Sequence, residues 1–262
     1  MKVKLITWNV NSIRARLQHI KKLIADVQPE IICLQETKVS NELFPKEFFL
    51  ESGFKHFYMN GIPSYNGVCI ISKLNASSSN SINWCSLKDG RHIMATWEKF
   101  DIHCFYVPAG GEIPDPNKNL KFKHKLDFLT ELKEWSLRER PKKTIICGDF
   151  NVAPREIDVW SHKQLANVIS HTLIERKSLK EFKESNSWVD IIEEKIFPPK
   201  HPFTWWSYRA KNHLISNKGR RLDHVWASND LRFKKISVKI VSETRGWERP
   251  SDHVPVLTEF II

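Results

Sequence analysis

Acid and amide side chains follow an apolar run in residues 148–154, which read Gly-Asp-Phe-Asn-Val-Ala-Pro. The preceding residues 144–147 are typical of a buried strand, and residues two apart on a strand project from the same face. We therefore expect Asp149 and Asn151 to point the same way. A carboxylate beside an amide can hold a hard cation, but Asp and Asn are also common in ordinary turns.

The same arrangement, an apolar run beside acid, amide or imidazole groups, recurs four more times along the chain. Each alone is a weak signal. Together, five such strand ends supply the oxygen ligands of a hard-cation site and an acid/base partner. The four further segments are 4–11 with Asn9 and Asn11, 31–38 with Gln35 and Glu36, 221–226 with Asp223, and 251–256 with Asp252 and His253.

Hydrolysis of a phosphodiester is the chemistry that fits these residue types. It requires a positioned water, a neutralised phosphate and a stabilised leaving oxygen, and Mg²⁺ can meet the last two needs. Mg²⁺ keeps several waters, so one or two carboxylates with an amide suffice, and Mn²⁺ could substitute. We expect Glu36 to be the first ligand. The other candidate ligands, which would serve one ion or two, are Asn9, Asp149, Asn151, Asp252 and His253.

Acid/base roles can be assigned to four of these side chains. Asp149 would activate the attacking water or protonate the leaving group, and Asn151 would donate to a phosphate oxygen. His253 would hold phosphate or act as a general base, with Asp223 orienting its imidazole. A structural histidine at a strand start is the alternative for His253. His224 directly follows Asp223 and should face away from it, in a structural role.

With these motifs, the chain resembles the exonuclease III family of DNA-repair enzymes. The family consists of apurinic/apyrimidinic endonucleases and belongs to the wider endonuclease/exonuclease/phosphatase superfamily. The matching motifs occur in the family's order and cover nearly the whole chain. Residues 106–108 (Tyr-Val-Pro) and 205–209 (Trp-Trp-Ser-Tyr-Arg) narrow the match to the repair branch. The motifs are residues 8–11, 34–38, 106–108, 148–154, 204–209, 221–224 and 251–253.

The resemblance also implies how the substrate is held. It makes Tyr106 the active-site tyrosine, whose phenol bonds a phosphate oxygen, although a core tyrosine is the alternative. The family usually has an amide side chain where this chain has Ala109, so one phosphate contact is missing. Trp205 and Leu222 fall on positions of the family's apolar pocket, which accepts a flipped deoxyribose without its base. Trp247 is a less direct candidate for the same pocket.

Basic residues beside the motifs could contact DNA phosphates, although solvated surface charge is the usual alternative. Lys and Arg outnumber Asp and Glu by 41 to 30, for a net charge of +11 and a pI near 9.4. This balance favours a polyanionic partner but also fits a merely soluble basic protein. The residues concerned are Arg14, Arg16, Lys38, Arg209, Arg220 and Arg221.

The alternation of apolar runs predicts one domain over residues 1–262. Consecutive strands without helices, as at 67–108, argue against a doubly wound parallel sheet. The pattern suits an α+β fold with two mixed β-sheets packed face to face and helices on the outer faces, the four-layered α/β sandwich that the resemblance implies. The expected strands are 3–10, 31–37, 67–73, 93–99, 102–108, 144–150, 223–228, 237–242 and 253–260.

Two long helices are expected between these strands. One is capped by Ser12 and closed by Pro29, and the other spans 119–140. The apolar face of the second should comprise Phe122, Leu126, Leu129, Leu132 and Trp135. Shorter helices are expected at 45–52, 160–170, 178–184 and 188–196, and the serine-rich residues 77–81 should form a loop.

Cysteine usage and the start of the chain bear on location. The five cysteines lack C-x-x-C spacing, and four lie in apolar runs, which indicates buried reduced thiols rather than zinc ligands or disulfides. Residues 1–7 enter a strand directly, without a stretch typical of a signal peptide or membrane span. We expect a monomer in the cytoplasm, associated with the nucleoid if the source is bacterial.

The expected function is a Mg²⁺-dependent DNA-repair hydrolase that cuts 5′ to abasic sites in double-stranded DNA. It should also have 3′ to 5′ exonuclease and 3′-phosphodiesterase activity, with abasic or 3′-blocked duplexes as partners. Two alternatives remain. One is another phosphodiesterase of the superfamily, acting on RNA or a phospholipid. The other is a nucleic-acid-binding module that has lost catalysis.

Overall fold

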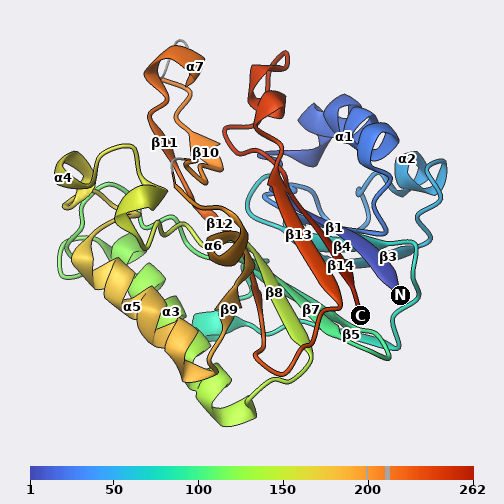
Figure 1. Ribbon diagram of the computed structural model, residues 1–262, viewed down its shortest axis with the longest axis horizontal. Coiled ribbons are helices and arrows are strands. Elements are labelled where there is room, and N and C mark those ends of the chain that lie inside the picture. Colours follow the sequence, from blue (N-terminus) through green and yellow to red (C-terminus); the bar gives the residue numbers. More distant parts are fainter. Residues whose placement is uncertain (199, 210–212) are drawn as a thin grey trace.

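The computed structural model describes residues 1–198, 200–209 and 213–262, and it shows two six-stranded mixed sheets packed face to face (Figure 1). In the first sheet the strand order is β13-β14-β1-β2-β4-β3, and in the second it is β5-β6-β7-β8-β12-β9. Helices α1 and α2 lie outside the first sheet and α3 and α5 outside the second. The predicted four-layered sandwich is confirmed.

The bounds of the elements are as follows. The first sheet comprises β1 Lys2–Asn9, β2 Ile31–Gln35, β3 His56–Asn60, β4 Val68–Ser72, β13 Lys235–Ile240 and β14 Val256–Ile261. The second comprises β5 Ser78–Asn80, β6 His92–Thr96, β7 Asp101–Tyr106, β8 Thr144–Asp149, β9 Val189–Asp190 and β12 Asp223–Ala227. A small ribbon joins β10 Trp205–Trp206 to β11 Gly219–Arg220. The helices are α1 Ile13–Val27, α2 Lys46–Leu50, α3 Leu120–Glu139, α4 His162–Leu165, α5 Leu173–Ser185, α6 Ile191–Lys195 and α7 His213–Ser216, with 3₁₀ turns at 84–86, 156–158 and 242–246.

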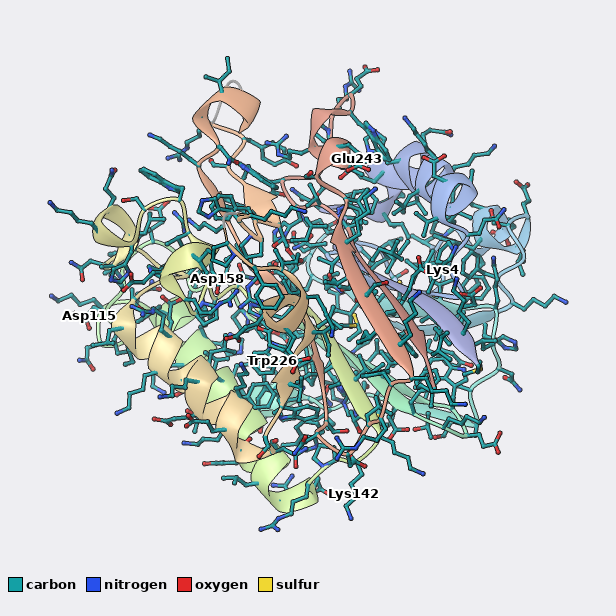
Figure 2. The ribbon with its side chains drawn as sticks, in the orientation of Figure 1. Lys4, Asp115, Lys142, Asp158, Trp226 and Glu243 are labelled. Atoms are coloured by element: carbon teal, nitrogen blue, oxygen red, sulfur yellow. The ribbon has the colours of Figure 1, made fainter. Side chains whose placement is uncertain are left out.

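Three apolar layers hold the sandwich together, one between the sheets and one under each pair of helices. Strand β8 shows how a single strand serves two of them. Ile145 and Cys147 face the other sheet, whereas Ile146 faces α3 and α5. Trp226 of β12 also lies in this second layer (Figure 2). The strands are apolar on both faces because both are covered, which explains why they appear in the sequence as continuous apolar runs.

All nine expected strands are present, including the edge strand β13, but the other edge strands of the two sheets, β3, β5 and β9, were missed. Residues 78–80 form β5, paired antiparallel with β6, so the predicted loop over 77–81 is wrong. All three residues of β5 are exposed. An edge strand formed by backbone hydrogen bonds alone carries no apolar pattern in its sequence. Strand β3 is half-buried throughout, and its central apolar run of Phe57, Tyr58 and Met59 is too short to indicate a strand.

The two long helices are confirmed as α1 and α3, with differences at their starts and faces. Ser12 makes no side-chain cap hydrogen bond, because its φ of 90° turns the chain into α1 by another route. Asn119 does cap α3, accepting from the backbone amides of residues 121 and 122. On the inner face of α3, Lys125 is fully buried, whereas Leu126 is only half-buried.

The shorter helices differ more from expectation. The helix expected at 160–170 is reduced to α4, and the segment 188–196 starts as strand β9 before α6. Helix α5 extends further in both directions than the expected 178–184, because Thr172 and Glu175 form a capping box at its start. Within the described residues, no helix combines the length and apolar character needed to cross a bilayer.

Candidate active site

Strand register brings three predicted site residues into one row. Tyr106 of β7 lies opposite Asp149 of β8, and Asp149 lies opposite Asp223 of β12. All three strands point these residues toward the other sheet, on the side of Cys147 and its neighbours. Gly148 allows the close approach of β8 to β7, because a Cβ there would lie 2.0 Å from the carbonyl oxygen of Phe105. The row therefore closes one end of the core between the sheets.

The first sheet contributes Asn9 and Glu36 to the same end. Asn9 is fully buried at the end of β1, and its Nδ2 donates to Glu36 Oε1 at 2.9 Å and to Asp149 Oδ2 at 3.0 Å. The hydroxyl of Tyr106 donates to Glu36 Oε1 at 2.8 Å. The hydrogen bonds from Asn9 to Asp149 and from Tyr106 to Glu36 run from one sheet to the other. The residues predicted from separate strand ends are thus brought into direct contact.

The segment 251–253 is fixed over this end by hydrogen bonds to β1 and β10. Ser251 Oγ donates to the carbonyl oxygen of Asn9 at 2.7 Å, and Trp8 Nε1 donates to the carbonyl oxygen of His253 at 3.0 Å. The backbone amide of Trp206 donates to the carbonyl oxygen of Asp252 at 2.9 Å. Asp252 and His253 therefore have fixed positions relative to Asn9.

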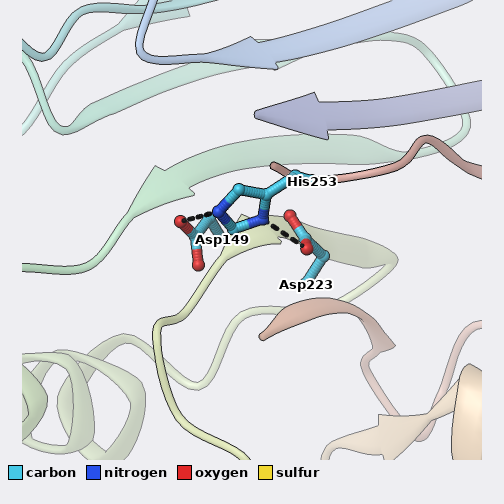
Figure 3. A group of neighbouring side chains, drawn as sticks. All are labelled: Asp149, Asp223 and His253. Carbon is cyan, nitrogen blue, oxygen red and sulfur yellow. Dashed lines mark hydrogen bonds and ion pairs between the residues drawn. The ribbon is translucent and has the colours of Figure 1, made fainter. Parts of the chain in front are cut away.

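His253 lies between two carboxylates (Figure 3). Its Nδ1 is 2.8 Å from Asp223 Oδ2, and its Nε2 is 3.5 Å from Asp149 Oδ2. Burial alone would lower the pKa of His253, but the charges of Asp223 and Asp149 outweigh it and raise the pKa to about 10. Burial raises the pKa of Asp149 to about 7, although the charge of His253 opposes this rise. The predicted contact between Asp223 and His253 is present.

Asn151 lies beside Asp149, as predicted, although β8 ends at Asp149 and Asn151 belongs to the loop that follows it. Its backbone amide donates to Asp149 Oδ1 at 2.9 Å, and its Nδ2 donates to Asp149 Oδ2 at 3.1 Å and to the carbonyl oxygen of Val107 at 2.9 Å. Both amide hydrogens therefore have protein acceptors in this arrangement. Its φ of 53° lies in the left-handed region, a strained conformation that clusters at functional sites.

Glu36, the expected first ligand of the metal, directly follows β2. Like Asn151, it has a left-handed backbone, with a φ of 52°. Lys38 Nζ is 2.8 Å from Glu36 Oε2 and 2.5 Å from Asn11 Oδ1. Burial would raise the pKa of Glu36, but the hydrogen bonds from Lys38 and Asn9 outweigh it and lower the pKa. A carboxylate and an amide oxygen that together accept an ammonium form a donor set that suits a hard cation.

Two further candidate ligands have specific orientations. Asn9 receives the backbone amide of Asn11 on its Oδ1 at 3.0 Å, so it turns its nitrogen, not its oxygen, toward the carboxylates. Asp252 is held by Trp205 Nε1 at 3.0 Å and by Asn11 Nδ2 at 3.2 Å. Asn11 thus links Glu36, through Lys38, to Asp252. The sequence offered one signal for it, an amide two residues after Asn9, but gave it no role.

A second group of ligand atoms lies within the site. One atom each from Asp149, Asp223 and His253 lie within 4.8 Å of one another, and all three residues are buried. Among the described residues this is the one cluster of three such side chains close enough to share an ion. The residues present can therefore hold a cation either beside Glu36 or beside Asp149.

The three apolar candidates for the sugar pocket separate into two places. Trp205 and Leu222 belong to one cluster, together with Ala153, Val159 and Leu165. The guanidinium of Arg220 lies 5.1 Å from the centre of the Trp205 ring, and its Nη1 donates to Ser170 Oγ at 2.8 Å.

Trp247 instead packs against α1. Its ring centre is 5.1 Å from that of His19, and Lys22 Nζ lies 4.8 Å above it. The structure thus does not bring Trp247 together with Trp205 and Leu222. The reason is that the segment before residue 251 turns back over α1, a course that the local sequence does not reveal.

The basic residues also have different surroundings. The expectation that Arg221 meets DNA is wrong, because its side chain is fully buried and pairs with Asp158 at 2.9 Å and Asp190 at 2.6 Å. Lys38 faces Glu36, and Arg14 is exposed on the first turn of α1. Arg16 donates to the hydroxyl of Tyr208 and to the carbonyl oxygen of Pro250, and Arg209 is exposed.

His224 occupies the opposite face of β12, as predicted. Its Nε2 is 2.8 Å from the carbonyl oxygen of Val152, and its ring stacks on Phe150 with 5.0 Å between centres. It therefore takes no part in the row formed by Tyr106 and Asp149.

Buried carboxylates, amides and a histidine meeting at the end of two packed sheets define a phosphodiester hydrolase. Residues 6–253 match the Endonuclease/Exonuclease/phosphatase family, and the chain belongs to this family. It is 28% identical to exodeoxyribonuclease III of Haemophilus influenzae, over 98% of this chain and 100% of that protein. The family and enzyme class predicted from the sequence are confirmed.

Two solved structures are also similar over 99% of this chain and 100% of theirs. One is an AP endonuclease from Archaeoglobus fulgidus, with 30% identity and a TM-score of 0.89. The other is the 3′ phosphatase NExo from Neisseria bound to product DNA hairpin, with 31% identity and a TM-score of 0.87. The resemblance to the exonuclease III and AP endonuclease branch is thus supported by both sequence and fold.

Proposed function

We propose that the protein is a DNA-repair nuclease that cuts duplex DNA 5′ to abasic sites and also removes nucleotides or blocking groups from 3′ ends. The observation that carries this proposal is the chain of contacts from Glu36 through Asn9, Asp149 and His253 to Asp223, in which three links are hydrogen bonds and the Asp149–His253 link is an ion pair of 3.5 Å. It joins a cation-binding carboxylate to an acid/base group across a few ångströms. The similar proteins named above act on DNA, abasic sites or 3′ phosphates by their descriptions.

Glu36 is the proposed main ligand of Mg²⁺, with Asp252 and the oxygen of Asn11 close by. When bound, the ion would neutralise the phosphate and stabilise the leaving oxygen. The ion would take the place of the Lys38 ammonium beside Glu36. Lys38 could then turn toward a DNA phosphate. The carboxylates of Asp149 and Asp223 offer a second position, and Mn²⁺ satisfies the same oxygen ligands.

Charge decides between the two roles considered for His253. Because Asp223 and Asp149 raise its pKa, the imidazole carries a positive charge at neutral pH. A charged imidazole can hold a phosphate oxygen but cannot accept a proton. Asp149, with its pKa raised by burial, is the better group to exchange a proton with water or with the leaving oxygen near neutral pH.

Selection of abasic sites must come from outside this charged row, because every phosphodiester presents the same group. Trp205 and Leu222 form the proposed apolar wall for a sugar without its base. Arg220 lies over Trp205 at the edge of this wall. Ala109 is exposed and offers no side-chain hydrogen bond, so Tyr106 would hold the phosphate without help from that position.

The test is hydrolysis of a duplex with one abasic analogue, in Mg²⁺ and in EDTA, by a protein whose oligomeric state is measured by light scattering. We expect a single cut 5′ to the analogue, lost in EDTA, from a monomer. An undamaged duplex, a single-stranded RNA and a phospholipid serve as parallel substrates. Faster hydrolysis of RNA or phospholipid would favour another branch of the family, and binding without cleavage of any of them would indicate a catalytically inactive module.

A further inference from the structure

A lysine lies fully buried in the layer between α3 and the second sheet. The side chain of Lys125 has no exposed surface, and neither has that of Glu175 on α5, with which it forms an ion pair. The surrounding layer is apolar and aromatic, with Phe122, Phe128 and Leu129 on the same helix face. Removing two charged groups from water is costly, and an apolar pair of similar volume is often at least as stable. The pair therefore calls for a role other than stability.

The ammonium of Lys125 contacts the two loops that follow β7 and β8. Its Nζ donates to the carbonyl oxygen of Asn151 at 2.8 Å and to that of Ala109 at 3.2 Å. Its third partner is the carboxylate of Glu175. An ammonium has three hydrogens, so each has an acceptor. One of these loops carries Asn151 itself, and the other begins directly after Tyr106, the last residue of β7.

Glu175 is fixed in turn by the start of α5. Its carboxylate accepts from the backbone amide of Ser170 at 2.9 Å and from the hydroxyl of Thr172 at 2.6 Å. The start of α5 therefore fixes Glu175, and Glu175 fixes the ammonium of Lys125. Lys125 in turn holds the two loops. The need for such support is visible at Asn151, whose left-handed backbone persists only where its surroundings impose it.

We propose that Lys125 is a positioning residue that holds the loops of Asn151 and Tyr106 in their reactive arrangement. It touches neither substrate nor ion, and it acts through the carbonyl oxygens of Asn151 and Ala109. The proposal rests on the proposed function and on the hydrogen bond from Asn151 Nδ2 to Asp149, the group proposed there to exchange a proton. Displacement of a reacting group by about 1 Å can lower a rate by about 100-fold, so loss of two hydrogen bonds to this loop should be visible in kcat.

The test replaces the ion pair without leaving a buried charge, by Lys125→Met together with Glu175→Gln. The glutamine retains an oxygen for the amide of Ser170 and the hydroxyl of Thr172. Wild-type protein is the reference, because Glu175→Gln alone would leave the Lys125 ammonium buried without its counter-charge. The matched control is Lys133→Met with Glu181→Gln, an ion pair of 3.1 Å between the same two helices that touches no site residue.

Kinetics on the abasic duplex separate positioning from general stability. At a temperature where all variants are folded, the Lys125→Met/Glu175→Gln protein should lose about 10- to 100-fold in kcat relative to wild type, with KM changed less than about threefold. The control pair should retain the wild-type kcat. An unchanged kcat in the first pair would overturn the proposal. If that pair does not fold, Lys125→Gln with Glu175→Gln takes its place, with the same expected loss.

A cycle with Asn151→Ala tests whether the effect passes through Asn151. In the wild-type background this substitution should cost a large factor in kcat, and in the Lys125→Met/Glu175→Gln background a factor at least about tenfold smaller. Equal large factors in both backgrounds would overturn the positioning role alone. A wild-type rate for Asn151→Ala would show that Asn151 gives Asp149 no support, and it would overturn the inference about Lys125 while leaving the proposed function to its own test on the abasic duplex.

Discussion

Removing the imidazole of His253 should damage both the rate and the stability of the protein. The ring is 4% exposed and lies between Asp223, which is fully buried, and Asp149, at 1%. Asp223 Oδ1 has no hydrogen-bond partner among the described residues. The negative charge of Asp223 is therefore compensated through the 2.8 Å contact of Oδ2 with His253. His253→Ala would leave two carboxylates on adjacent strands without their shared counter-charge.

The size of the effect follows from this geometry. Leaving one partner of a buried pair alone costs about 3–5 kcal/mol of unfolding free energy. Loss of a group that acts in acid/base or phosphate contacts lowers the rate by about 10² to 10⁴. Asp223→Asn should lower the rate by a similar factor, because it removes the charge that keeps His253 protonated and oriented. It should destabilise the fold less, since it removes one of the two repelling carboxylates.

The assay is a double-mutant cycle with two readings, kcat on the abasic duplex and the free energy of unfolding in urea. Because the two side chains act as one unit, the double variant should lose far less than the product of the two single losses in rate. It should also be more stable than His253→Ala, because Asp149 no longer faces a second buried charge. Rate losses that multiply, or a double variant less stable than His253→Ala, would refute the reasoning.

Three other outcomes are expected. Glu36→Ala should raise the Mg²⁺ concentration needed for half-maximal activity and lower turnover while circular dichroism stays unchanged; the wild-type metal dependence would contradict its role as ligand. Arg221→Met should cost about 3–5 kcal/mol in urea unfolding, because Asp158 and Asp190 become buried without their shared arginine, and a loss below about 1 kcal/mol would show that the charges are compensated elsewhere. Stability should fall as pH drops below 6.5, because burial lowers the pKa of His103 to about 3 and that of His92 well below its ordinary value, so the unfolded chain binds protons that the folded chain does not. Each histidine contributes about 1.4 kcal/mol per pH unit in this window, and a His103→Gln protein with the same slope would contradict the assignment.

Much of the site could be predicted from the sequence because it depends on strand periodicity. Period two turns Asp223 toward the site and His224 away from it, and the apolar run before Asp149 marks the strand end beside which Asn151 lies. Residues at the ends of buried strands then meet when two sheets pack face to face. For this reason, Glu36 and Asp223 could be named before their partners were known.

The remainder depends on contacts between distant segments. The burial of Arg221 follows from Asp158 and Asp190, which lie on other elements, and net charge does not reveal it. Lys125 lies next to Leu126, which the helical period placed on the apolar face. Its acceptor Glu175 is 50 residues away in the sequence. The course of residues 242–250 over α1 decides the place of Trp247. Local patterns carry no information on such pairings.

The most direct measurement of the central claim is the hydrolysis of the abasic duplex by Asp149→Asn, with analysis of the ends that the wild-type protein produces. Asn151, Asn9 and His253 all converge on this carboxylate. Asparagine has the same size and keeps one acceptor oxygen for them, so the variant should fold and bind DNA. Wild-type protein should give a 3′-hydroxyl and a 5′-deoxyribose phosphate in Mg²⁺ and no product in EDTA. The variant should be slower by about 10² to 10⁴. A variant with the wild-type rate, or an unsaturated 3′ end formed without metal, would contradict hydrolysis by this site.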